Sequence, residues 1–244
     1  MRDSGVRKGW RIATACTLAI GLLTLASAET ETLRRVLVIG DSIMNLLARS
    51  IERAAAGDKA LSVATFTSLG SGLARLDLFD WPGRIEALIR EHRPDTLVLM
   101  MGANDRQPMQ VDGRILQPDT PEWDEEYARR VARIFELAEA GGVRHVVWLE
   151  LPDMREPAVQ AHAERVNAIV RAEAARRAGA EFFETRPILS RKPGVYSAYI
   201  VQANGMPLEV RSRDGIHLNR SGADLLAEQL LSRLKMPRAA PSVP

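Results

Sequence analysis

The stretch Leu33-Arg34-Arg35-Val36-Leu37-Val38-Ile39-Gly40-Asp41-Ser42 decides the fold class of this chain. Residues 36–39 form a continuous apolar run, which is typical of a strand buried on both faces in a parallel sheet. Gly40 and Asp41 end the strand, and apolar residues at helical spacing follow at once from Ser42. A buried strand that runs directly into a helix predicts an α/β protein.

The same order of strand and helix repeats along the 244 residues. Such alternation implies a parallel sheet that is covered by helices on both faces. We therefore predict a three-layer sandwich around a five-stranded parallel sheet. A small β-hairpin is expected as an insertion near residues 195–211, with Asn204-Gly205 as its two-residue turn. The expected strands are residues 33–39, 61–66, 96–101, 143–151 and 181–184, and the expected helices begin at residues 42, 82, 121, 157 and 220.

Residues 1–28 have the layout of a secretory signal peptide. A basic start is followed by an apolar stretch, residues 12–25, and by the small-residue cleavage site Ala26-Ser27-Ala28. The alternative is an uncleaved N-terminal anchor, although a membrane span needs about 20 apolar residues. We expect a periplasmic or secreted protein with no stable membrane insertion, made of one domain over residues 29–236 and a disordered proline-rich tail over residues 237–244.

The charge of the chain does not indicate nucleic acid binding. The whole chain carries 33 Lys and Arg against 31 Asp and Glu. Residues 1–28 hold four of the basic residues and one acidic residue, so the remaining chain has 29 basic against 30 acidic residues. A protein that binds nucleic acid is expected to have a clustered basic patch instead. The single cysteine, Cys16, lies in the same segment, so the mature protein is expected to hold no disulfide.

Three residues supply the groups that turn a weak alcohol into a nucleophile. Ser42 follows the first strand, while Asp214 and His217 lie close together near the C-terminus. In a serine hydrolase the imidazole takes the serine proton, and the carboxylate holds the imidazole in the required tautomer. The alternative is structural: a serine that caps a helix, an aspartate in a turn and an exposed histidine.

A second set of groups is expected at the same edge of the sheet, because sites in parallel sheets form at the carboxyl ends of strands. Asn104 follows the third strand, and Gly70 and Gly72 lie in the loop after the second strand. The Asn104 amide, one glycine N–H and the Ser42 N–H would form an oxyanion hole. The alternative for residues 102–105 is an ordinary turn, in which these residue types are common.

Other kinds of site are not indicated. The remaining histidines show no metal-ligand spacing, and the sequence has no phosphate loop and no dinucleotide fingerprint. We therefore expect neither a metal nor a cofactor. The Gly-x-Ser-x-Gly elbow of the α/β-hydrolases is absent as well, since Ile43 and Met44 follow Ser42. A serine enzyme with this sequence requires a different scaffold.

Taken in chain order, four blocks of this sequence resemble the SGNH/GDSL hydrolase family. The blocks are Gly40-Asp41-Ser42, Gly70 or Gly72, Gly102-Ala103-Asn104-Asp105 and Asp214-Gly215-Ile216-His217. The resemblance covers roughly residues 33–235 and implies a flavodoxin-like sheet. It also implies that Ser42 is the nucleophile, His217 the base and Asp214 its orienting acid. Ser42, a glycine and Asn104 would form the oxyanion hole.

Longer stretches are similar to one exported bacterial subgroup of that family, the DUF459-type proteins. Ile43 replaces the usual leucine after Gly-Asp-Ser, and Gly72 is favoured over Gly70 because Leu-Ala-Arg follows it. The alternative for the charged and aromatic residues near the site is an ordinary loop salt bridge with an aromatic plug. The similar stretches are residues 72–75, 79–82, 102–107, 123–124 and 214–219. The residues expected to line the substrate are Asp41, Arg75, Asp80, Trp81, Asp105 and Arg106.

The resemblance implies an exported serine esterase that cleaves an acyl ester, of acetyl or short-chain type, through an acyl-enzyme. One alternative is an O-acyltransferase that moves the acyl group to an envelope polysaccharide or glycan and works with a membrane acyltransferase partner. A further alternative is a non-catalytic glycan-binding module. The sequence does not identify the acceptor, because the loops that exclude water cannot be placed from it.

Overall fold

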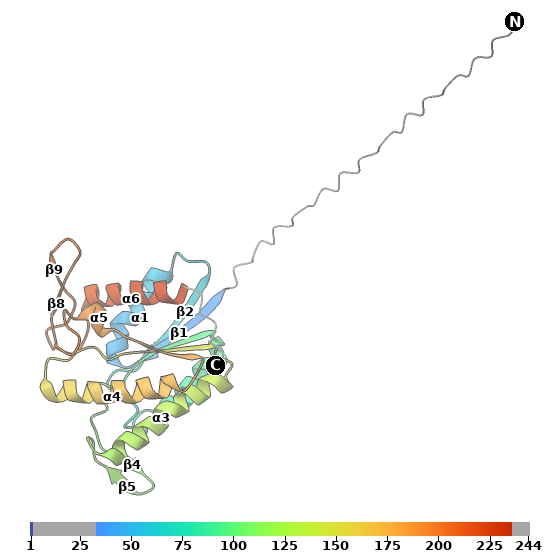
Figure 1. The fold of residues 1–244 in the computed structure, drawn as a ribbon. Helices are drawn as coiled ribbons and strands as arrows, with labels where there is room; N and C mark the ends of the chain where they lie inside the picture. Colours follow the sequence, from blue (N-terminus) through green and yellow to red (C-terminus); the bar gives the residue numbers. More distant parts are fainter. Residues whose placement is uncertain (2–32, 236–244) are drawn as a thin grey trace. The chain divides into compact units, whose positions relative to one another are not determined.

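The computed structural model describes residue 1 and residues 33–235 (Figure 1). At the centre of residues 33–235 is a five-stranded sheet in the order β2-β1-β3-β6-β7, and every neighbouring pair in it is parallel. This confirms the predicted sheet. Its strands are β1 (Arg34–Gly40), β2 (Leu61–Thr67), β3 (Thr96–Met100), β6 (His145–Leu149) and β7 (Ala180–Phe183).

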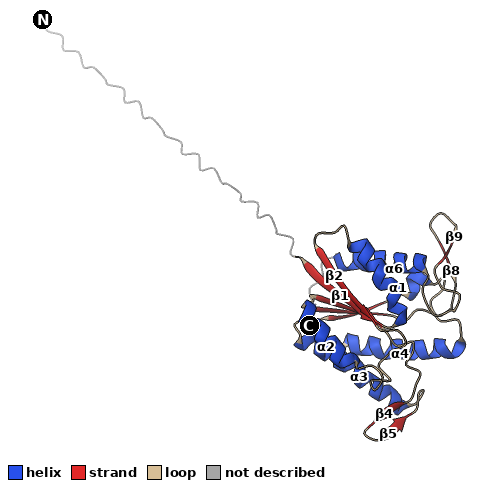
Figure 2. Cartoon of the chain, turned by 180° about the vertical axis from the view of Figure 1, so that it is seen from behind, coloured by secondary structure: helices blue, strands red, loops and turns tan. Residues whose placement is uncertain are grey.

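Helices cover both faces of this sheet, as Figure 2 shows. On one face α1 (Ser42–Ala55) packs against α6 (Arg220–Lys235). On the other face α3 (Pro121–Ala140) lies between α2 (Trp81–His92) and α4 (Pro157–Ala175). The predicted three-layer sandwich is therefore confirmed. A short helix that was not predicted, α5 (Arg186–Leu189), contacts α6; a single turn is too short to show helical periodicity.

The apolar face of α1 shows how sequence pattern becomes packing. Met44, Leu47 and Ile51 recur at helical spacing, and all three are fully buried against the sheet and α6. Burial of each such side chain contributes about 1.5–3 kcal/mol to folding. The start of α1, which carries Ser42, is thus attached to the buried core of the protein.

A close approach between β1 and β3 fixes the place where α1 begins. A Cβ atom at Gly40 would lie 2.1 Å from the Met100 carbonyl oxygen, so only glycine fits at the end of β1. The Asp41 N–H donates to that same oxygen at 3.2 Å. The Asp41 side chain accepts from the Ile43 N–H at 2.9 Å and caps α1. Ser42 is consequently the first residue of α1, at the carboxyl edge of the sheet.

The predicted hairpin consists of β8 (Tyr199–Val201) and β9 (Pro207–Glu209), but its turn differs from the prediction. The Gln202 N–H donates to Met206 O at 3.0 Å, and the Gly205 N–H donates to Gln202 O at 2.9 Å. The connection is therefore three residues long, and Gly205 takes the left-handed conformation with φ 81°. The prediction of a two-residue turn was wrong because the Asn-Gly pair is also compatible with a three-residue connection.

A second hairpin, β4 (Met109–Val111) and β5 (Arg114–Leu116), was not predicted. Its turn is Asp112-Gly113, and both residues have positive φ, 49° and 77°. This is the backbone of a type I′ turn, for which Asp-Gly is a preferred pair. The signal was present in the sequence, between two short apolar stretches.

Two expectations concern residues that the structure does not describe. The predicted signal peptide, residues 1–28, and the predicted tail, residues 237–244, lie outside the described part of the chain except for residue 1. Among residue 1 and residues 33–235, no helix is both long and apolar enough to cross a membrane. The same residues contain no cluster of His, Cys, Asp and Glu that could hold a metal ion.

Candidate active site

The fold brings together three side chains from opposite ends of the chain. The Ser42 hydroxyl oxygen lies 2.9 Å from His217 Nε2, although the two residues are 175 positions apart. His217 Nδ1 lies 2.8 Å from Asp214 Oδ2. About a third of the His217 side chain remains exposed, so the hydrogen-bonded chain is open to solvent on one side.

The protonation of this chain follows from the environment of Asp214. Partial burial raises the pKa of Asp214, but hydrogen bonds from the backbone N–H groups of Ile216 and His217 and from the His217 ring outweigh it and lower the pKa to about 2. Asp214 is therefore a carboxylate at neutral pH and can only accept. His217 Nδ1 must carry the ring proton, which leaves Nε2 free to accept the Ser42 hydroxyl proton.

Two arginines that the sequence did not single out hold the Asp214–His217 loop. The Arg211 side chain is buried, and its guanidinium donates to Ile216 O at 2.8 Å and to Asp153 O. Arg155 donates from its backbone N–H to Gly215 O at 3.1 Å. Its guanidinium donates to the carbonyl oxygen of Arg213, the residue before Asp214, at 2.7 Å. Arg211 lies only three residues before Asp214, but nothing in the sequence pattern indicates that its side chain turns back onto this loop.

Asp41 is one of the residues predicted to line the substrate, and the structure contradicts this. Its side chain is fully buried, where it accepts from the Ile43 N–H at 2.9 Å and from the Gly102 N–H at 3.0 Å. Burial raises the pKa of Asp41 to about 7, although these two N–H groups oppose the shift. Asp41 thus connects the turn before α1 to the turn after β3, and its side chain is closed off from solvent.

Asn104 lies beside the loop after β2. Its side-chain amide donates to Ser71 O at 3.0 Å, so one amide N–H is used, and the second has no partner among residues 33–235. Ser42 contributes another uncommitted donor, because N–H groups in the first turn of a helix have no partner inside the helix. The N–H groups of Gly70 and Gly72 have no hydrogen-bond partner in the described residues either.

The two glycines of this loop have different surroundings. Gly72 is buried, and a Cβ on it would lie 2.0 Å from Asp105 Oδ1, whereas Gly70 is exposed and has φ 70°. The C=O and N–H of a trans peptide point in opposite directions. Because Asn104 donates to Ser71 O, the Gly72 N–H of that same peptide points away from the Asn104 amide. The preference for Gly72 as the partner of Asn104 therefore loses support, which leaves Gly70 as the other predicted glycine.

Asp105 was also predicted to line the substrate, and it too is buried. Its carboxylate accepts from the N–H groups of Leu73 and Ala74 and from the Tyr127 hydroxyl at 2.8–2.9 Å. Burial raises the pKa of the Asp105 carboxyl, and the three donors oppose this shift. Asp105 holds the loop after β2 from inside the protein.

The other four predicted lining residues make local contacts. Trp81 is fully buried, and its indole N–H donates to the Ser71 hydroxyl at 3.1 Å, so the prediction was wrong for Trp81 as it was for Asp41 and Asp105. Asp80 caps α2 by accepting from the Gly83 N–H at 3.0 Å. The arginines form loop salt bridges: Arg75 with Asp77 at 2.7 Å and Arg106 with Asp119 at 3.0 Å. These salt bridges agree with the alternative interpretation, while the lining role of Asp80, Arg75 and Arg106 stays a prediction because all three side chains remain at least partly exposed.

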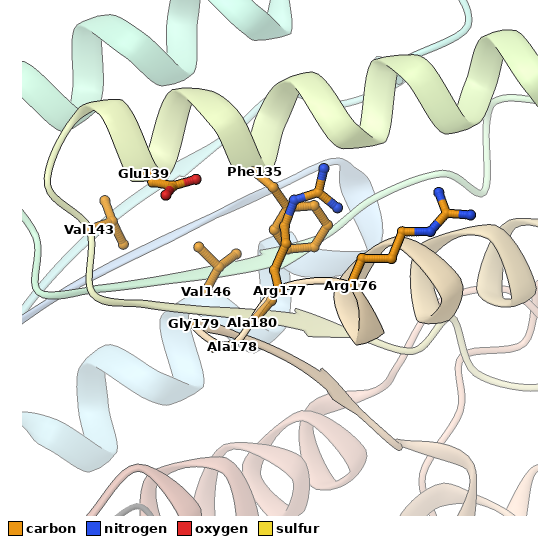
Figure 3. Close-up of a pocket in the computed structure, with 9 residues that line it drawn as sticks. All are labelled: Phe135, Glu139, Val143, Val146, Arg176, Arg177, Ala178, Gly179 and Ala180. Atoms are coloured by element: carbon orange, nitrogen blue, oxygen red, sulfur yellow. The ribbon is translucent and has the colours of Figure 1, made fainter. Parts of the chain in front are cut away.

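A separate pocket lies at the opposite edge of the sheet (Figure 3). Its volume is about 440 Å³, and it is bounded by Phe135 and Glu139 of α3, Val146 near the start of β6, and Arg176 and Arg177 just after α4. These residues adjoin the amino ends of β6 and β7, while Ser42 and Asn104 follow the carboxyl ends of β1 and β3. The pocket is therefore not part of the candidate active site.

A family model described as "Protein of unknown function (DUF459)" matches residues 35–233. The chain belongs to the DUF459 family. The matched range includes Ser42, Asp214 and His217. No curated protein matches this DUF459 sequence.

Solved structures show which fold this DUF459 protein has. It resembles Axe2, an acetylxylan esterase from Geobacillus stearothermophilus, with TM-score 0.57, 16% identity, and coverage of 86% of this chain and 98% of Axe2. A carbohydrate esterase family 3 protein from Talaromyces cellulolyticus gives TM-score 0.53, 17% identity, and coverage of 83% and 96%. The catalytic domain of the Streptococcus pneumoniae peptidoglycan O-acetyltransferase OatA gives TM-score 0.52, 14% identity, and coverage of 84% and 94%. At such identities the likeness establishes the SGNH hydrolase fold.

Proposed function

We propose that this DUF459 protein is a serine esterase with Ser42 as its nucleophile. The observation that carries the proposal is the unbroken chain from Asp214 through His217 to the Ser42 hydroxyl, with distances of 2.8 and 2.9 Å. His217 Nε2 takes the Ser42 proton as the oxygen attacks an ester carbonyl, and then gives that proton to the leaving alcohol. Water, activated by the same imidazole, releases the acid from the acyl-enzyme.

The developing negative charge on the ester oxygen needs donors, and three are available. The Ser42 N–H stands at the N-terminus of α1, where the helix dipole favours negative charge. The second N–H of the Asn104 amide has no partner in the described part of the chain. A glycine N–H of the loop after β2 would complete the hole, and the peptide geometry favours Gly70 over Gly72 for a glycine that acts together with Asn104.

For the substrate we propose an acetyl or short-chain ester carried by a glycan. Two of the similar structures are named as carbohydrate-acting esterases, and those names support this class for a chain with the same fold. Export is part of the proposal because residues 1–28 have signal-peptide layout. A glycan of the cell envelope would then be within reach of the enzyme.

An O-acyltransferase is the second candidate, and one observation favours it: the fold is shared with the catalytic domain of OatA, a peptidoglycan O-acetyltransferase. The first half of the reaction would be the same, and a sugar hydroxyl would then replace water as the acceptor. A membrane acyltransferase would supply the acyl group in this case. A glycan-binding module without catalysis is less well supported, because it would not require the assembled Ser42–His217–Asp214 chain.

The experiment compares the purified wild-type protein with Ser42→Ala, using p-nitrophenyl acetate with and without xylo- or chitooligosaccharides. An esterase releases nitrophenol without sugar and loses this activity in Ser42→Ala. A transferase forms acetylated sugar and accelerates when sugar is added. If mass spectrometry finds no acyl-enzyme and a serine-directed phosphonate does not label Ser42, both enzymatic proposals fail and a binding module remains.

A further inference from the structure

The loop after β2 is held by side chains on both sides of its backbone. The N–H groups of Leu73 and Ala74 donate to the two oxygens of Asp105 at 2.9 and 2.8 Å. The C=O groups of the same two residues accept from Arg130 Nη1 at 2.6 and 2.9 Å. Four consecutive backbone groups therefore depend on one carboxylate and one guanidinium.

Both of these side chains are anchored by α3. The Tyr127 hydroxyl donates to Asp105 Oδ2 at 2.8 Å, and Arg130 Nε donates to Glu126 Oε1 at 2.7 Å. Tyr127 and Asp105 are buried, and about 10% of the Arg130 side chain is exposed. Hydrogen bonds to charged groups are strongest where water is excluded, so this network ties the loop firmly to a rigid helix.

Leu73 and Ala74 lie next to the residues proposed to form the oxyanion hole. Leu73 follows the Ser71-Gly72 peptide, whose carbonyl accepts from the Asn104 amide, and Asp105 follows Asn104 in the chain. The loop belongs to no strand or helix, so no sheet or helix hydrogen bonds fix these groups. Their position relative to Asn104 is set by Asp105 on one side and by Arg130 on the other.

We infer that Arg130 is a positioning residue for the oxyanion hole. It touches neither Ser42 nor the ester; it acts through the carbonyls of Leu73 and Ala74 by keeping the loop after β2 at the distance that Asn104 and the glycine N–H require. The inference rests on the proposed esterase function. If Arg130 only stabilised the fold, its loss would lower stability without affecting the oxyanion specifically.

Arg129 provides a matched control on the same helix. Its Nε donates to the other oxygen of Glu126 at 2.9 Å, but its side chain is 62% exposed and contacts neither Leu73 nor Ala74. The experiment compares Arg130→Met with Arg129→Met by kcat and KM for p-nitrophenyl acetate and by thermal unfolding. We expect Arg130→Met to lower kcat by about 10- to 100-fold with KM within about twofold, and Arg129→Met to match the wild type. Arg130→Lys should recover part of kcat, because an ammonium can donate to both carbonyls.

A second readout separates positioning from a general structural effect. The thionoester analogue carries sulfur in place of the carbonyl oxygen and accepts hydrogen bonds weakly, so a damaged oxyanion hole should slow it less. We expect the ratio of ester to thionoester rates to fall at least several-fold in Arg130→Met. If Arg130→Met does not fold, Arg130→Lys carries the test: it keeps a donor near the Leu73 and Ala74 carbonyls but loses the fixed guanidinium geometry, so the ratio should still fall, by less than in Arg130→Met.

Two results would overturn the inference while the proposed function stands. In the first, the wild type shows Ser42-dependent turnover, and Arg130→Met has the same kcat and KM as Arg129→Met. The other is a loss of kcat that is equal for ester and thionoester. In contrast, a wild type without Ser42-dependent turnover or phosphonate labelling would overturn the esterase proposal itself.

Discussion

Asp41 Oδ2 accepts a hydrogen bond from the Gly102 N–H at 3.0 Å and so connects the turn that carries Ser42 to the turn that carries Asn104. The other oxygen of Asp41 caps α1 through the Ile43 N–H. One buried carboxyl group therefore sets the distance between the nucleophile and a proposed oxyanion donor. Because this carboxyl group is buried, its ionisation is unfavourable in the folded protein, and stability therefore depends on pH.

The Asp41 carboxyl should make stability fall as pH rises. Burial raises its pKa from 3.8 to about 7, so between these values the folded protein keeps a proton that the unfolded chain has lost. The folded state is then progressively destabilised from about pH 4 to pH 7, by at most about 4 kcal/mol. The Asp41→Asn side chain cannot ionise, but it leaves one backbone N–H without an acceptor. That loss should lower the free energy of unfolding by about 1–3 kcal/mol. Urea unfolding should find Asp41→Asn less stable than wild type at pH 4, with a gap that shrinks by pH 8; a gap independent of pH would contradict the assignment.

His217→Ala should reduce turnover by about 10³-fold or more while the protein stays folded. The substitution removes the base that accepts the Ser42 proton, and the half-buried ring lies outside the buried apolar core, so the fold should not depend on it. Ester hydrolysis and circular dichroism on the same samples check both halves of this expectation. A variant that turns over at the wild-type rate would show that another group removes the proton.

Asn104→Ala should slow acylation by about 10²- to 10³-fold, the usual effect of removing one oxyanion donor. It should also lower the free energy of unfolding by about 1 kcal/mol, since Ser71 O loses its donor. Stopped-flow measurement of the acylation burst separates the first effect from deacylation. An unchanged burst rate, with the loss of stability alone, would reduce Asn104 to a structural residue.

Gly72→Ala and Gly70→Ala should differ in the size of their effects on stability. A methyl group at Gly72 would lie 2.0 Å from Asp105 Oδ1, so the substitution forces that carboxylate away from the Leu73 and Ala74 N–H groups. We expect a loss of about 3 kcal/mol or more. At Gly70 there is open space, and the cost is the left-handed backbone, about 1 kcal/mol. Urea denaturation of both variants gives the comparison, and equal losses would mean that Asp105 moves aside easily.

Much of the architecture follows from local pattern. The apolar runs of β1 and β3 and the helical spacing after Ser42 are properties of short segments, and burial of apolar surface acts on them in the same way in any parallel sheet. The two hairpin turns show the limit of such patterns. Asn-Gly and Asp-Gly indicate a turn correctly, but the length of the connection depends on how the flanking strands pack.

The sequence by itself determined the strand order along the chain and the residue types of the candidate site, because hydrophobic period and turn chemistry are local. It also placed Ser42, Asn104 and the second loop at one edge, since strands of a parallel sheet end together. Only the tertiary structure decided that Asp41, Asp105 and Trp81 point inward and that Arg211 and Arg130 hold the site's loops. The direction of a side chain and its distant partners depend on how helices and loops pack around the sheet, and no short stretch of sequence carries that information.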